Sequence, residues 1–169
     1  MKNSERCFKS LMIAALFISL NATAENRDII LQKISNVDFD TVNIRAGSCN
    51  FDSATETMSG DGKRNICSSY KGSKGVFKLT AEPNKLIEVE FKSTRTPNGL
   101  IQFNPKGVAR SDFKEYQLVY DVPVQFMVGT SGIVDIEMGG ELEFFGPLNH
   151  SSNYSIDYDI KYKYIEVTK

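Results

Sequence analysis

The strictest pattern in this sequence is a two-residue alternation that runs through NYSIDYDIKYKY, near the C-terminal end. One set of alternate positions is aromatic or aliphatic: Tyr154, Ile156, Tyr158, Ile160, Tyr162 and Tyr164. The positions between them are polar or charged: Ser155, Asp157, Asp159, Lys161 and Lys163. Successive side chains of a β-strand point to opposite faces, whereas a helix repeats every 3.6 residues. The alternation therefore predicts an amphipathic strand that packs on a core and exposes its charges.

Two roles remain open for this predicted strand. It can complete a sheet of its own domain, with one apolar and one solvated face. It can also be a sheet edge that pairs with another chain, as in exported β-domains that polymerise by donated strands. The six aromatic and aliphatic residues listed above are therefore a candidate strand-pairing edge. After Tyr164 the apolar positions change parity to Ile165 and Val167, which predicts a β-bulge near Tyr164.

The preceding part of the chain also has the two-residue period of strands. Four runs are rich in β-branched and aromatic residues: LIEVEF, EYQLVYDVPVQFMV, GIVDIEM and GELEFF. The last two are joined through Gly139-Gly140, and Pro123 predicts a break or a bulge within the second. Asp61-Gly62 and the Pro-Asn pairs of AEPNK and RTPNG are turn signals. Short strands separated by turns are typical of an antiparallel sandwich or barrel, and we expect a sandwich.

The N-terminal segment has the three parts of a secretory signal peptide. Lys2, Arg6 and Lys9 precede an uncharged run, and Ala22-Thr23-Ala24 is a small-x-small cleavage motif. The apolar run is shorter than the about 20 residues that span a membrane, although an uncleaved anchor remains the alternative. We expect cleavage after Ala24, which leaves one domain at residues 25–169.

The charge of the expected mature chain excludes one class of partner. The sequence has 20 basic and 21 acidic side chains, of which the leader contains three and one, so 17 and 20 remain and the net charge is −3. This charge is neither strongly positive nor clustered, which argues against nucleic-acid binding. The mature chain contains no further apolar run that could cross a membrane as a helix. We therefore expect a protein of the periplasm, cell surface or extracellular space.

Two cysteines, Cys49 and Cys67, follow the leader. In an oxidising compartment two cysteines a short loop apart are most simply a disulfide. The sequence has no CxxC motif for redox chemistry and no nearby histidine for a metal. The spacing therefore predicts a Cys49–Cys67 disulfide.

Several stretches resemble a bacterial secreted family, domain-of-unknown-function family 4402. The resemblance rests on IILQKISNVDFDTVNIRAG, GVFKLTAEPNKLIEVEF, DIEMGGELEFF and NYSIDYDIKYKY. Val37-Asp38-Phe39 occupies the family's first corner, where Asp40 replaces the usual glycine, and Gly139-Gly140 with Leu142 matches its Gly-Gly-x-Leu strand. The cysteine pair is not part of the family pattern. The resemblance implies an immunoglobulin-like secreted domain, often associated with surface appendages or adhesion, without assigned catalytic residues.

A looser likeness is to chaperone–usher fimbrial subunits. An early disulfide and a tyrosine-bearing terminal strand fit that class. The N-terminal ENRDIILQKI fits poorly as a donor strand, because it is short and has no central glycine. This likeness implies other surface-structure subunits or a periplasmic chaperone as partners.

Groups for catalysis or metal binding are few. The single histidine, His150, lies in the turn-like GPLNHSSN, where solvent exposure is more common than catalysis. Three acidic pairs alternate on strand faces and could bind calcium, although solvated faces are the simpler interpretation: Asp38 with Asp40, Asp135 with Glu137, and Asp157 with Asp159. We expect no cofactor and no enzyme activity. The expected function is a non-catalytic structural or adhesive subunit of a bacterial surface structure; a free-standing binding module for a glycan or small ligand is the alternative.

Overall fold

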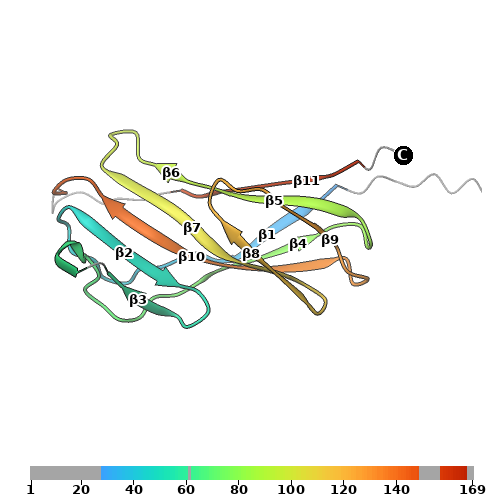
Figure 1. Cartoon of the computed structure of the whole chain (residues 1–169), viewed down its shortest axis with the longest axis horizontal. Coiled ribbons are helices and arrows are strands. Elements are labelled where there is room, and N and C mark those ends of the chain that lie inside the picture. Colours follow the sequence, from blue (N-terminus) through green and yellow to red (C-terminus); the bar gives the residue numbers. More distant parts are fainter. Residues whose placement is uncertain (1–27, 61, 149–156, 167–169) are drawn as a thin grey trace, which may run out of the picture.

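The computed structural model describes residues 28–60, 62–148 and 157–166, which form antiparallel β-sheets (Figure 1). The expectation of an all-β protein is confirmed. In chain order the elements are β1 (Ile30–Ser35), β2 (Gly47–Asp52), β3 (Thr57–Ser59), the 3-10 turn η1 (Gly62–Arg64), β4 (Gly75–Thr80), β5 (Leu86–Lys92), β6 (Thr94–Arg95), β7 (Ile101–Ser111), β8 (Lys114–Val119), β9 (Val124–Met127), β10 (Ile133–Phe144) and β11 (Asp159–Tyr164). Within these ranges, no helix is long and apolar enough to cross a membrane.

The long strand β10 organises the larger sheet because both of its edges are paired. β7 pairs with one edge along almost its whole length. The other edge is shared, first by β4 and then by β2. β1 extends the sheet beyond β4, β3 extends it beyond β2, and β6 and β8 pair with the outer edge of β7.

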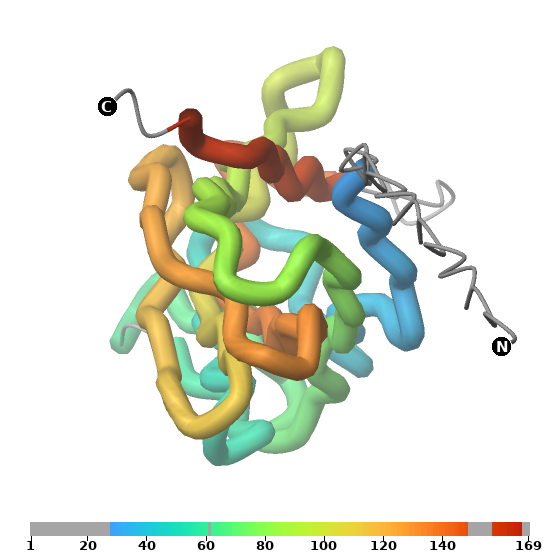
Figure 2. The backbone as a smooth tube through the Cα atoms, turned by 90° about the vertical axis from the view of Figure 1, so that its right-hand side faces the viewer, coloured from blue at the N-terminus to red at the C-terminus, as the bar shows by residue number. Residues whose placement is uncertain are grey.

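The smaller sheet has the order β11-β5-β9 and lies over one half of the larger sheet (Figures 1 and 2). The two sheets share one apolar cluster, so the arrangement is sandwich-like. Its buried members come from both layers: Phe77, Leu79, Ala109, Leu118, Val134, Ile136 and Met138 from the larger sheet, and Ile87, Val89, Phe91, Phe126 and Ile160 from the smaller. The alternation of LIEVEF is the sequence signal for this contact, because Ile87, Val89 and Phe91 are all completely buried.

A second apolar cluster is formed in the other half of the molecule, the half that contains β2 and β3 at the lower left of Figure 1. Cys49, Phe51, Met58 and Ile66 are buried in it. Phe39 bridges the two halves, because its ring lies edge-on to Phe51 at 6.1 Å and to Phe103 of the other cluster at 5.9 Å. Irregular segments close this half, which explains why its sequence lacks long alternating runs.

The predicted division at Gly139-Gly140 is wrong, since β10 continues through both glycines. Both positions lie where another backbone approaches closely. A Cβ on Gly139 would lie 2.4 Å from the Phe51 carbonyl oxygen, and one on Gly140 would lie 2.4 Å from the Asn104 carbonyl oxygen. The glycines therefore permit close strand packing rather than a turn.

Three local expectations have mixed outcomes. The break at Pro123 is confirmed, because β8 ends at Val119 and β9 begins at Val124. The bulge near Tyr164 is wrong: β11 pairs with β5 without a register shift and ends at Tyr164, so the change of parity marks the end of the strand. Of the Asp61-Gly62 turn signal, Gly62 begins the 3-10 turn η1, and Asp61 lies outside the described residues.

Candidate functional site: the outer edge of β11

β11 is anchored in its own domain. It pairs antiparallel with β5 in an unbroken register, and the Ile165 backbone N–H extends this pairing by donating to the Leu86 carbonyl at 2.9 Å. The Ile160 side chain is 8% exposed and belongs to the shared apolar cluster. The described part of this strand therefore completes the small sheet of its own chain.

Tyrosines attach both ends of β11 to the rest of the domain. The Tyr158 ring lies edge-on to Phe77 at 5.6 Å, and its hydroxyl donates a 2.9 Å hydrogen bond to Asn36 Oδ1, just after β1. Burial, helped by the charge of Asp157, raises the pKa of the Tyr158 phenol. At the other end the Tyr164 hydroxyl accepts a 2.8 Å hydrogen bond from the Glu82 backbone N–H. These contacts direct the tyrosine rings towards the larger sheet and out of the plane of the small sheet.

The solvent face of β11 is matched in charge to β5. The register places Asp159 opposite Lys92, Lys161 opposite Glu90 and Lys163 opposite Glu88. Opposite charges directly across an antiparallel pair are favourable, and like charges are unfavourable. A slip of two residues would bring Asp159 beside Glu90, so the charges specify the register as well as the face.

The other edge of β11 has no strand partner among the described residues. In an antiparallel strand the N–H and C=O of one residue point to one side, and those of the next residue point to the other. Because the Ile165 N–H points to β5, the backbone groups of Lys163, Lys161 and Asp159 point there too. The backbone groups of Ile160, Tyr162 and Tyr164 therefore point outward. We call this the outer edge of β11.

Four of the six candidate strand-pairing residues lie in the described part of the chain. The outward-pointing backbone groups of the outer edge belong to Ile160, Tyr162 and Tyr164, and Tyr158 lies just before β11. Tyr162 is 37% exposed, the largest exposure among the apolar side chains of β11. Tyr154 and Ile156 lie outside the described residues.

The expected disulfide partners are joined in the structure. The Sγ atoms of Cys49 and Cys67 lie 2.01 Å apart. Cys49 is completely buried in the second apolar cluster, on β2, and Cys67 follows η1. The bond therefore ties the irregular segment after η1 to the larger sheet.

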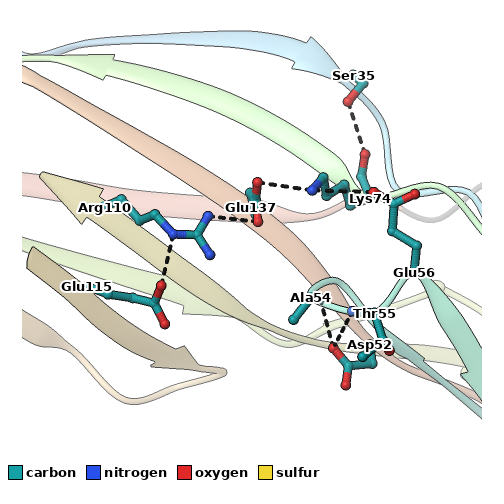
Figure 3. A network of polar contacts seen from close by, with 9 residues as sticks. All are labelled: Ser35, Asp52, Ala54, Thr55, Glu56, Lys74, Arg110, Glu115 and Glu137. Atoms are coloured by element: carbon teal, nitrogen blue, oxygen red, sulfur yellow. Dashed lines mark hydrogen bonds and ion pairs between the residues drawn. The ribbon is translucent and has the colours of Figure 1, made fainter. Parts of the chain in front are cut away.

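Glu137, one member of the proposed acidic pair on β10, belongs to a charged network on the outer face of the larger sheet (Figure 3). The Glu137 carboxylate lies 3.0 Å from Lys74 Nζ and 2.8 Å from Arg110 Nη1. Glu56 extends the network from Lys74, and Glu115 extends it from Arg110. Burial favours protonation of Glu137, but the hydrogen bonds from Arg110 and Lys74 outweigh it and lower the pKa of the carboxyl.

This network links residues on or next to five strands, β3, β4, β7, β8 and β10, and both oxygens of Glu137 are already paired with cations. Asp38, from another acidic pair, instead accepts a 2.8 Å hydrogen bond from the Asp40 backbone N–H in its own turn. The described residues contain no cluster of three or more histidine, cysteine, aspartate or glutamate side chains that could hold a metal. His150 lies outside the described residues.

One exposed aromatic side chain was not predicted from the sequence. Phe113 is fully exposed at the tip of the β7–β8 hairpin. The preceding Asp112 has a positive φ of 50° and is held by the β9–β10 loop, accepting hydrogen bonds from the Thr130 N–H at 2.7 Å and the Ser131 hydroxyl at 2.6 Å. The Ser131 hydroxyl, followed by the Thr130 N–H, lowers the pKa of the Asp112 carboxyl. Asp112, a residue type that tolerates a positive φ in turns, was the only local signal for this turn.

Comparisons with protein-family models, curated proteins and solved structures find no match to this chain. The geometry of the outer edge of β11 is consequently the main guide to function.

Proposed function

We propose that the protein is an exported, non-catalytic structural or adhesive subunit of a bacterial cell-surface structure and assembles through its sheet edge. The observation that carries this proposal is the outer edge of β11. Three successive outward-pointing residues, Ile160, Tyr162 and Tyr164, offer backbone donors and acceptors that no described strand uses. Edge strands of soluble proteins are usually short or protected because they pair readily with other chains.

The mode of assembly would be β-augmentation. An added strand gains affinity from main-chain hydrogen bonds and specificity from alternate side chains. Because Ile160 is buried and β11 is registered on β5 by charge, the strand can receive a partner without leaving its own sheet. This differs from donation of the strand itself, which would expose the apolar cluster.

The signal-peptide pattern of residues 1–24 and the sandwich-like architecture support export to the periplasm or beyond. We propose an immunoglobulin-like sandwich as the finer fold, with other surface-structure subunits or a periplasmic chaperone as partners. The resemblance to family 4402 and the looser likeness to fimbrial subunits point in the same direction.

The proposal is tested by expressing the full chain in a Gram-negative bacterium and following its maturation, location and size. We expect a mature mass that begins at Glu25, protease accessibility on intact cells, and assemblies larger than a monomer. A full-length chain retained in the cytoplasm would contradict the export part of the proposal.

A proline substitution tests the role of the edge. Tyr162→Pro removes an N–H that points away from β5, so the pairing within the domain is retained while the outer edge loses a donor. Tyr162→Ala is the matched control, because it removes the same side chain and retains the N–H. We expect assembly to fall with Tyr162→Pro and to persist with Tyr162→Ala; equal assembly of both variants would remove the edge from the proposal.

A second candidate function is a binding module for a glycan or small ligand, and Phe113 is the observation that favours it. Aromatic rings exposed on rigid loops stack on the apolar faces of such ligands. Phe113→Ala should abolish binding to a glycan panel, whereas Tyr70→Ala, which removes another exposed ring, should not. Absence of binding by the unmodified protein would reject this function.

A further inference from the structure

In the segment Asp157–Lys163, DYDIKYK, tyrosines and charged residues are placed symmetrically about Ile160, and the charges on the two sides are opposite. Reading outward from Ile160, Tyr158 matches Tyr162, Asp159 is opposed by Lys161, and Asp157 by Lys163. All four charged side chains are exposed. A strand with this pattern is complementary to a second copy of itself in the antiparallel direction, because reversal exchanges its acidic and basic halves.

The backbone N–H and C=O groups of β11 that point outward belong to the residues that such pairing requires. Ile160 lies on the outer edge, so an antiparallel pair with a two-fold axis at this residue hydrogen-bonds Ile160 to its own counterpart. Tyr158 then faces Tyr162 of the second copy on the inner side, and Asp159 faces Lys161 on the solvent side. Asp157 faces Lys163 one step further along. Every charged side chain of the segment meets an opposite charge.

Neighbouring registers lack this property. A two-fold axis at Tyr162 would place Lys161 opposite Lys163, and an axis at Tyr158 would place Asp157 opposite Asp159. Like charges directly opposite one another in a sheet are unfavourable. An axis at Asp159 or Lys161, which the same backbone alternation allows, would place that charged residue opposite its own copy. The charge pattern therefore selects the axis at Ile160 from these five registers.

The existing pairing with β5 strengthens the argument. Asp159 lies opposite Lys92 of β5 in its own chain, and in the dimer it would lie opposite Lys161 of the second copy. That Lys161 in turn lies opposite Glu90 of the second copy's β5. Positive and negative charges thus alternate across four strands. Edge strands that avoid pairing place like charges, often lysines, along the edge; an edge with one acidic and one basic half instead attracts its own copy.

We propose that two copies of this protein associate edge to edge through β11, antiparallel about a two-fold axis at Ile160, and join their small sheets into one of order β9-β5-β11-β11-β5-β9. The pairing covers the half-exposed Tyr162 ring and satisfies the outward backbone groups. A two-fold contact of this kind is isologous and therefore closed. The inference deepens the proposed assembly role and rests on it, since it names the partner of the same edge.

Charge substitutions test the register. The mature protein, purified from the periplasm, should show a concentration-dependent monomer–dimer equilibrium by sedimentation, weakened by salt. The dimer would contain four intermolecular charge pairs, because the Asp159–Lys161 and Asp157–Lys163 pairs each occur twice. The double variant K161D/K163D makes both members of every pair acidic, and D157K/D159K makes both members basic. Each should raise the dimer dissociation constant at least about tenfold. An equimolar mixture of the two should form heterodimers with affinity near that of the unmodified protein.

Cross-linking provides a second test in case the charge variants lose their fold. Asp159 and Lys161 of two copies would form a non-hydrogen-bonded pair with Cα atoms about 4.5 Å apart, within the range of a disulfide. A mixture of D159C and K161C chains should cross-link under mild oxidation much faster than either chain alone. A mixture of D159C with K163C, displaced by two residues, is the control and should cross-link slowly.

The outcomes separate this inference from the function on which it rests. Equal cross-linking in all mixtures, or variants that associate as the unmodified protein does, would overturn pairing at Ile160. A chain that assembles with other surface proteins while its own copies never associate would overturn the homodimer and leave the proposed function intact. A chain that dimerises through β11 but is never exported would overturn the proposed function and leave the homodimer intact.

Discussion

Lys163 Nζ lies 3.0 Å from Glu88 Oε1 and joins the solvent face of β11 to that of β5. Glu88 also accepts a 2.8 Å hydrogen bond from Gln125 on β9, so one carboxylate connects all three strands of the small sheet. The hydrogen bond from Gln125, followed by that from Lys163, lowers the pKa of Glu88. The position of β11 is thus set by polar contacts outside as well as by Ile160 inside.

A charge exchange between these two residues tests that link. Glu88→Lys or Lys163→Glu alone creates a like-charged cross-strand pair and should lower the melting temperature by about 1–3 °C, as expected of an exposed pair. The double exchange E88K/K163E should recover most of the loss in thermal unfolding followed by circular dichroism. Additive losses in the double variant would show that the two side chains do not interact.

The Glu137 network should make a larger contribution, because its central carboxylate is only 21% exposed. Glu137→Gln keeps the shape but removes the charge that pairs with Lys74 and Arg110, leaving two cations beside an amide. We expect a loss of about 1–3 kcal/mol in the free energy of unfolding, measured with denaturant. Asp135→Asn, on the same face of β10 and exposed, is the control and should change little.

The same carboxyl gives a pH dependence with a defined sign. Its folded-state pKa lies below the usual value of 4.5, so its contribution to stability is complete above that pH. The contribution should be lost as pH falls below 4.5 and through the folded-state pKa. In Glu137→Gln this part of the acid destabilisation should disappear. Parallel stability curves for the two proteins from pH 7 to the acid range would contradict it.

Gly140 should tolerate no side chain. Its φ of 138° lies outside the range that L-residues normally adopt, and an added Cβ would overlap the Asn104 carbonyl oxygen. Gly140→Ala should therefore cost about 2–4 kcal/mol in the free energy of unfolding. Gly146→Ala is a matched control, since the nearest atom to its Cβ would be Leu100 Cδ2 at 3.6 Å. A similar stability for both variants would reject the close-approach explanation.

The sequence predicted strands best where one face is buried and the other is solvated. β5 and β11 follow this pattern closely, and both were identified with the correct faces. β7 was missed although it pairs along almost all of β10, because Pro105 and Gly107 interrupt its pattern. Pro105 is tolerated in this central strand because it falls in the gap between the residues paired with β6 and those paired with β8.

The candidate site was only partly predictable for a similar reason. Alternation identified the residues of β11, but not which of its edges is free, because that depends on the strand order β11-β5-β9. The Glu137 network joins Lys74, before β4, to Arg110 on β7 through a strand pairing that no local pattern specifies. Phe113 was overlooked since a single apolar residue in a turn carries no periodic signal.

The Cys49–Cys67 bond should be present in the exported protein. Thiol labelling of the denatured, unreduced mature chain should detect no free cysteine, and two labelled thiols would contradict the bond. The double substitution C49A/C67A should lower stability by about 3 kcal/mol in the chain-entropy model, because the bond closes a loop across a sequence separation of 18. Reduction of the unmodified protein should produce a similar loss.

Hydrogen exchange should reveal the outer edge of β11 residue by residue. The Lys161, Lys163 and Ile165 amides point to β5 and should exchange slowly, whereas those of Ile160, Tyr162 and Tyr164 should exchange rapidly in the monomer. Raising the protein concentration should slow the exchange of Ile160 and Tyr162, since these amides would enter the intermolecular ladder. Uniform protection along the strand at low concentration would mean that the outer edge is already covered. Unchanged rates in a sample that sedimentation shows to be dimeric would place the contact elsewhere on the protein.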